Sequence, residues 1–170
     1  VVCYNEHRQN LRHKANRNGF RQMFNGGETD LRAIASHNVH ESVGKYQEGG
    51  TAVLTYGNLL QQFNQEGSGR DDLGLGRWTY MRFVGEDRIV TRVICGYSPC
   101  ANKKKDSGTV YQQHRHHLIN KLKDDSCPRA RFREDLLRQM KQWRKDGERL
   151  ILCVDANENI YRGELGRRLT

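Results

Sequence analysis

The chain has 170 residues, and its 29 Lys and Arg residues outnumber its 20 Asp and Glu residues, giving a net charge of +9. A chain of this length is expected to form one domain spanning residues 1–170. Its longest apolar run, residues 150–154, is far shorter than the roughly 20 residues that cross a bilayer. No charged-then-apolar leader opens the chain, so we expect neither a membrane span nor a signal peptide.

The first half of the chain predicts strands joined by loops. Residues 1–6 form a β-branched run that predicts a strand, and residues 50–56 predict another. Residues 58–63 either continue or pair with that second strand. Residues 7–48 are polar and basic, and we expect loops there with at most one short strand. Residues 67–76 carry four glycines and two aspartates, which is typical of a surface loop.

The second half predicts a β-hairpin, two helices and a buried strand. Residues 77–83 and 88–95 are β-forming runs separated by a turn, which indicates the hairpin. Apolar residues recur at helical spacing over 109–123 and again over 128–146. Residues 150–154 are wholly apolar, a pattern typical of a strand buried on both faces.

The five cysteines do not suggest a disulfide framework. Cys3, Cys95 and Cys153 stand in β-like apolar runs, where we expect them to be small buried hydrophobic residues. The chain also has no Asn-x-Ser/Thr glycosylation triplet. Both features favour a reducing, intracellular location, the nucleus included.

Three strands end in residues that could carry chemistry. The apolar runs end at Glu6, Tyr97 and Asp155. A carboxylate at the end of a buried strand is costly unless a positive group meets it, so Glu6 and Asp155 each require a cation or an arginine. One shared Mg²⁺ would satisfy both, because this ion takes few carboxylates together with water and phosphate oxygens. Strand-end acids are also common as caps and turn formers, and spacing alone leaves that alternative open.

Four segments resemble the motifs of one known family. Residues 1–7 (VVCYNEH) resemble the strand of the endonuclease/exonuclease/phosphatase (DNase I-like) superfamily that ends in Gln-Glu, and residues 49–54 (GGTAVL) resemble its Gly-Gly strand. Residues 92–99 (RVICGYSP) are similar to its Tyr-x-Pro-Asn strand, and residues 152–157 (LCVDAN) to its Gly-Asp-x-Asn motif. The segments occur in the family's order, and the loop content is similar to the retroelement-type endonuclease branch.

The resemblance implies a DNase I-like α/β sandwich of two mixed β-sheets with outer helices. It implies hydrolysis of DNA phosphodiesters with Mg²⁺ or Mn²⁺, and no nucleotide cofactor. By position, Glu6 would hold the metal, and Asp155 would orient or deprotonate the attacking water. Asn157 would hydrogen-bond the phosphate or the neighbouring acid. Tyr97 would contact the phosphate and stabilise the transition state through a hydroxyl that ionises or donates.

The sequence also departs from the family pattern. Asn5 and Val154 replace a Gln and a Gly, and Cys100 replaces the Asn that follows Tyr-x-Pro. The chain contains no Asp-His dipeptide, and the family's first and last motifs would lie before residue 1 and after residue 170. We therefore expect a partial domain that is inactive alone. A phosphatase of the same superfamily and a non-catalytic nucleic-acid-binding module on the same scaffold remain alternatives.

Two basic segments follow the strand ends and predict contacts with DNA phosphates. The alternative is an ordinary solvated surface. The basic residues concerned are Arg8, Arg12, Lys14, Arg17, Arg21, Lys103, Lys104 and Lys105.

One histidine cluster could suggest zinc. His114, His116 and His117 share a predicted helix and are followed by Cys127, but on a helix the three imidazoles point in different directions. We therefore do not expect a zinc site there.

Overall fold

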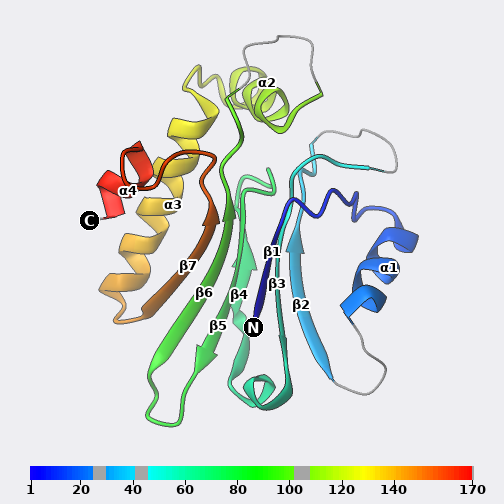
Figure 1. Cartoon of the computed structure of the whole chain (residues 1–170), viewed down its shortest axis with the longest axis vertical. Coiled ribbons are helices and arrows are strands. Elements are labelled where there is room, and N and C mark those ends of the chain that lie inside the picture. The colour runs from blue at the N-terminus through cyan, green and yellow to red at the C-terminus, as the bar shows by residue number, and fades with distance from the viewer. Residues whose placement is uncertain (25–29, 41–45, 102–107, 170) are drawn as a thin grey trace.

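The computed structural model describes residues 1–24, 30–40, 46–101 and 108–169. These residues form strands and helices in an α/β arrangement (Figure 1). In chain order the elements are β1 (Val2–Asn5), α1 (Lys14–Phe24), β2 (Leu31–Ser36), β3 (Thr51–Tyr56), the 3₁₀ helix η1 (Gly57–Gln61), β4 (Phe63–Arg70), β5 (Trp78–Val84), β6 (Val90–Tyr97), α2 (Val110–Leu122), α3 (Pro128–Lys145), β7 (Arg149–Asp155) and α4 (Glu164–Leu169).

The strands form two sheets. One has the order β1-β3-β2 and is antiparallel throughout its described strands. The other has the order β4-β5-β6-β7, with an antiparallel β5–β6 hairpin and a parallel β6–β7 pair. Parallel neighbours need a long crossover, and α2 and α3 provide it. The expectation of two mixed sheets is therefore correct only for the four-stranded sheet.

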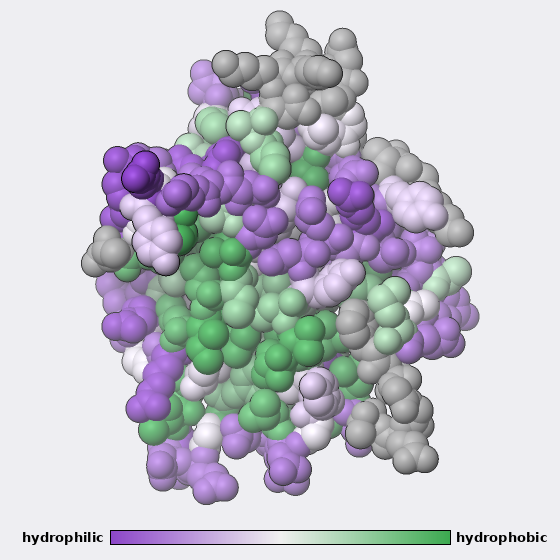
Figure 2. All heavy atoms as spheres, in the orientation of Figure 1, coloured by the Kyte–Doolittle hydropathy of each residue, from purple (hydrophilic) through white to green (hydrophobic). Residues whose placement is uncertain are grey.

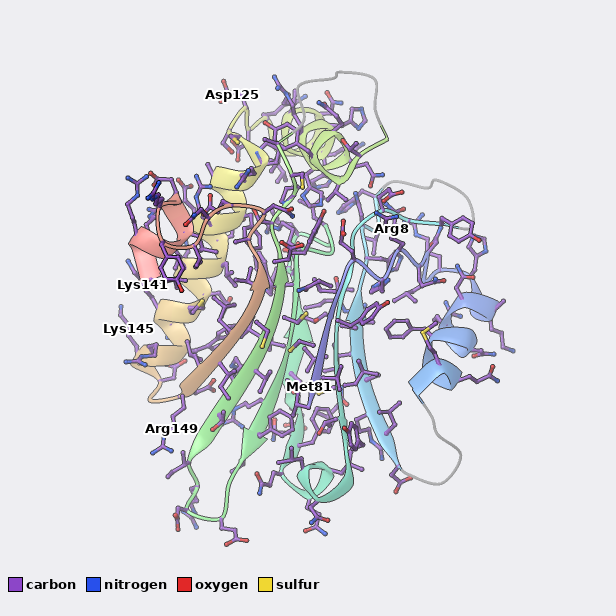
Figure 3. All side chains as sticks on the ribbon, in the orientation of Figure 1. Arg8, Met81, Asp125, Lys141, Lys145 and Arg149 are labelled. Atoms are coloured by element: carbon purple, nitrogen blue, oxygen red, sulfur yellow. The ribbon has the colours of Figure 1, made fainter. Side chains whose placement is uncertain are left out.

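Apolar residues on alternating strand positions fill the layers between these elements. Val53, Met81 and Cys95 meet between the two sheets, where Figure 3 shows Met81. Because successive side chains of a strand point to opposite faces, their neighbours face outward against helices. Phe132 of α3 packs on the four-stranded sheet, and Phe20 of α1 packs on the three-stranded sheet. The result is a sandwich with a helix on each outer face.

The predicted hairpin, both predicted helices and the strands at 1–6, 50–56 and 150–154 are confirmed as elements. The expectation that residues 150–154 are buried on both faces is wrong, because β7 is an edge strand. Residues 58–63 instead form η1 and the first residue of β4. None of the described helices has an apolar stretch long enough to cross a membrane.

The prediction for residues 7–48 missed one helix. α1 carries two asparagines and a glycine, and Phe20 is its only residue in a buried apolar cluster among the described side chains. Asparagine and glycine are poor helix formers, so local propensity in this basic segment favours loops over a helix. The short strand expected in this region is β2.

The prediction of a surface loop over residues 67–76 is partly wrong. Gly67 and Gly69 lie in β4, and their lack of a side chain makes room for the neighbouring strand β5. A Cβ at Gly67 would lie 2.2 Å from Cδ of Arg82, and one at Gly69 would lie 2.9 Å from the Tyr80 hydroxyl. Glycine here reflects close packing in a sheet.

Two of the edge strands, β1 and β7, leave apolar side chains exposed. Val2 and Ile151 are exposed, and Figure 2 shows hydrophobic surface over this region, below a hydrophilic band. Cys153 is also exposed, contrary to the expectation that it is buried, because β7 is the edge of its sheet. Cys95 is buried and Cys3 is half-buried, and all five cysteines are free thiols.

A buried ion-pair network shapes the segment between β4 and β5. The Arg77 guanidinium donates to Asp71 at 2.8 Å and to Asp135 of α3 at 2.9 Å. Burial alone would raise the pKa of Asp71, but the Arg77 guanidinium and the backbone N–H of Leu73 lower it below its usual value. The Arg77 carbonyl in turn accepts the Tyr97 N–H at 2.8 Å. This network therefore fixes the end of β6.

We predict that Asp71→Ala lowers the free energy of unfolding by about 3–5 kcal/mol, because it leaves the buried Arg77 with only one carboxylate partner. Urea denaturation measures the change. The matched control is Asp72→Ala, since Asp72 is exposed and its loss is expected to stay within about 0.5 kcal/mol. Equal losses in the two variants would contradict the structural role of the network.

Candidate functional site

The three strand ends singled out by the sequence meet at one edge of the sandwich. Tyr97 and Asp155 are register partners at the ends of the parallel strands β6 and β7. Glu6 follows β1 in the other sheet, and the Tyr97 hydroxyl donates to Oε1 of Glu6 at 2.6 Å. The structure thus brings Glu6, Tyr97 and Asp155 together from two sheets.

Tyr97 is a neutral phenol at this site. The residue is 4% exposed, and burial, the hydrogen bond to Glu6 and the negative charges of Glu6 and Asp155 raise its pKa well above the ordinary value of 10. The sequence alone does not decide whether this hydroxyl ionises or donates. With a raised pKa the hydroxyl keeps its proton at neutral pH and acts as a donor.

Asp155 and Asn157 form a tight turn directly after β7. The Asn157 N–H donates to Oδ1 of Asp155 at 3.1 Å, and Asn157 has a φ of +47°, which asparagine tolerates better than most residues. The Asn157 side chain donates to the Ser98 carbonyl at 2.7 Å and accepts the Cys100 thiol at 2.8 Å. Asp155 is therefore a turn former, which was the alternative to a metal ligand that its position in the sequence left open. The Asn157 amide links the ends of β6 and β7.

Glu6 is held by the glycine pair of the second strand motif. Its N–H donates to the Gly50 carbonyl at 2.8 Å, and Glu6 itself has a φ of +52°. Such a φ is costly for a residue with a side chain and persists only when its surroundings impose it. The Gly49 carbonyl accepts a second backbone hydrogen bond, from the Arg8 N–H at 3.0 Å.

His7 explains why residue 50 is glycine. The Gln9 N–H donates to Nδ1 of His7, so Nε2 carries the proton and donates to the Ser36 carbonyl at 2.9 Å. Burial lowers the pKa of His7, which keeps this tautomer neutral. A Cβ at Gly50 would lie 2.5 Å from the His7 ring. His7 thus links the ends of β1 and β2 and has both ring nitrogens committed.

Two hollows open at this edge, one beside each carboxylate. The first, of about 560 Å³, is lined by Glu6, Arg8 and Tyr97 among others. The second, of about 630 Å³, is lined by Asp155 and Asn157 together with apolar residues of α3, β7 and α4.

The oxygens at this edge are compatible with a hard divalent cation. Glu6 and Asp155 supply carboxylates, which Mg²⁺ and Mn²⁺ favour. Neither is ion-paired with a described Lys, Arg or His. In the described ranges no group of three His, Cys, Asp or Glu side chains is placed to hold a metal. A cation here would therefore take most of its ligands from water or substrate.

The histidine and cysteine cluster considered for zinc is spread out. His114 is buried and contacts the Leu75 carbonyl at 3.0 Å, whereas His117 stacks on His40 with ring centroids 3.8 Å apart. Cys127 instead contacts the Tyr111 hydroxyl at 3.7 Å. These side chains do not converge on one point.

Part of the predicted basic surface lies within the described residues. Arg8 lines the first hollow, lies at the strand-end edge in Figure 3, and is ion-paired with Glu48 at 3.5 Å. Arg12 and Lys14 are exposed near the start of α1. Lys103, Lys104 and Lys105 lie outside the described residues.

Arg129 of α3 supports the site and was not expected from the sequence. Its guanidinium donates to the Asn157 carbonyl at 3.2 Å and to Glu158 at 3.0 Å. α3 contains many charged residues, so its sequence does not indicate which arginine contacts the turn after β7. Glu48, the ion-pair partner of Arg8, was also not predicted. Its position directly before the Gly-Gly motif is a weak sequence indication that it lies near the site.

Comparison of the chain with protein-family models, curated proteins and solved structures finds no match.

We predict that Gly50→Ala destabilises the protein more than Gly57→Ala. Both glycines have positive φ, +89° and +65°, and either substitution should cost about 1–2 kcal/mol of backbone strain. A Cβ at Gly57 meets nothing within 4 Å, whereas one at Gly50 collides with His7, adding about 1–3 kcal/mol. Denaturant unfolding measures both. Similar losses would show that the His7 ring moves aside freely.

Proposed function

We propose that the strand-end edge is a metal-dependent phosphodiesterase centre that acts on DNA, on a DNase I-like scaffold of the retroelement-endonuclease type. The observation that carries the proposal is the convergence of Glu6, Tyr97 and Asp155 from two sheets. The Tyr97 hydroxyl donates a hydrogen bond to Glu6 there. Two carboxylates and a neutral phenol beside open hollows suit metal-assisted attack on a phosphate.

Each residue has a role that its surroundings support. Glu6 would hold Mg²⁺ or Mn²⁺, which when bound supplies positive charge and lowers the pKa of water. Asp155 would orient the attacking water or accept its proton. Tyr97, kept protonated by its raised pKa, would donate to a phosphate oxygen. Asn157 would position Asp155 through the turn they share.

The structure also bears on which group could protonate the leaving oxygen. His7 is adjacent to Glu6, but its Nδ1 accepts from Gln9 and its Nε2 donates to Ser36. It is therefore unsuited to general acid catalysis.

We predict that the longest natural form of the protein nicks supercoiled plasmid with Mg²⁺ or Mn²⁺ and not with EDTA. Glu6→Gln and Asp155→Asn should each lower the rate by about 10²- to 10⁴-fold, because each removes a charge at the reacting phosphate. Glu66→Gln is the matched control, since Glu66 is exposed on β4. If both site variants nick as fast as the parent, the assignment is wrong.

A second function, DNA binding without cleavage, is favoured by one observation. The Asn157 amide is already occupied by Ser98 and Cys100, which leaves less of it for a phosphate. A binder would retain its affinity for duplex DNA in Glu6→Gln and Asp155→Asn. If it neutralises about six phosphates, its log affinity should fall with log salt with a slope of about −5. Loss of nicking in the variants with unchanged binding would instead support the phosphodiesterase.

A further inference from the structure

A separate cavity of about 420 Å³ lies where α1, β2 and β4 meet. It shares no residue with the two hollows at the strand-end edge. Figure 1 shows α1 beside β2 on the side of the molecule opposite to α3. Leu11, Phe20, Ala33 and Ala35 give this cavity an apolar wall. Its volume falls in the range of small-molecule sites.

His37 is the unusual member of its lining. The side chain is 6% exposed, and neither ring nitrogen has a hydrogen-bond partner among the described residues. Buried polar atoms are nearly always paired, and leaving a buried imidazole unpaired is costly. A ligand that offers an acceptor to His37 would remove that cost.

The charged groups around the cavity are cations. Arg17 and Arg70 line it, and its described lining residues include no carboxylate. Burial, together with the positive charges of Arg12 and Arg70, lowers the pKa of His37 to about 4. His37 is therefore neutral at pH 7 and surrounded by arginines from α1, β4 and the segment before α1.

We propose that this cavity binds a small phosphorylated organic molecule of the nucleoside monophosphate class. The phosphate would lie near Arg17 and Arg70, and the organic part would rest on the wall formed by Leu11 and Phe20. His37 would hydrogen-bond the ligand after a rotation of its ring. Arginine suits this role because its planar fork recognises phosphate oxygens. This site is independent of the chemistry proposed for the strand-end edge.

An anion next to His37 favours its protonated form, so binding should raise its pKa. We expect that 2′-deoxyadenosine 5′-monophosphate (dAMP), titrated into the protein and followed by NMR of the histidine rings, raises the pKa of His37 from about 4 by one or more units. The exposed His116 of α2 should not change. No saturable effect on His37, or an equal effect on His116, would overturn the proposal.

Variants separate a built site from general attraction to a basic protein. Arg70→Gln should weaken dAMP binding at least fivefold, whereas Arg32→Gln, an exposed control on β2, should leave it unchanged. Deoxyadenosine without phosphate should bind at least tenfold more weakly. Arg70 is exposed, so its replacement is expected to leave the fold intact. Equal weakening by Arg70→Gln and Arg32→Gln would refute the site.

Two further binding measurements identify the source of the ligand and test whether the cavity is independent of the strand-end edge. A short deoxyadenosine oligonucleotide that competes with dAMP would place a nucleotide of a DNA strand in the cavity, and failure to compete would assign it to free nucleotides. Glu6→Gln should bind dAMP like the parent. Failure of dAMP to bind would thus reject this cavity without affecting the nicking experiment, and loss of binding in Glu6→Gln would contradict their independence.

Discussion

The arrangement at the strand-end edge depends on the hydrogen bond from the Tyr97 hydroxyl to Glu6. Each partner needs the other, because a buried phenol requires an acceptor and a half-buried carboxylate requires a donor. Such a bond to a charged group contributes only about 1.5–3 kcal/mol. Its larger effect is geometric, since it fixes the end of β1 in one sheet against the end of β6 in the other.

Several contacts outside the edge keep these three residues in place. The Arg77 carbonyl holds the Tyr97 N–H, and Arg77 is itself locked by Asp71. The Gly50 carbonyl holds the Glu6 N–H, while Arg129 holds the turn that contains Asn157. These supports come from three separate segments of the chain. The edge is therefore a product of the whole sandwich, which suits a site that must present its groups rigidly.

The sequence predicted the strands, and with them the meeting of Glu6, Tyr97 and Asp155, because uninterrupted apolar runs mark strands and their polar ends gather at one edge. It failed where tertiary contacts override local pattern. α1 is held largely through Phe20, and Gly67 is a packing residue rather than a loop residue. Arg129 could not be found, because its partner lies 28 positions away in the turn after β7.

The charge distribution constrains how this edge could meet a phosphate. The buried arginines Arg77 and Arg92 form ion pairs with buried acids. These acids are Asp71, Asp135 and Glu148, so the net charge of +9 does not lie in the interior. That surplus is borne by solvent-facing side chains, which would attract a polyanion. At the edge itself two carboxylates would repel it, and Arg8 is paired with Glu48 rather than with Glu6. A phosphate could approach Glu6 and Asp155 only with a cation between them, which is the physical reason for assigning a divalent metal to the proposed reaction.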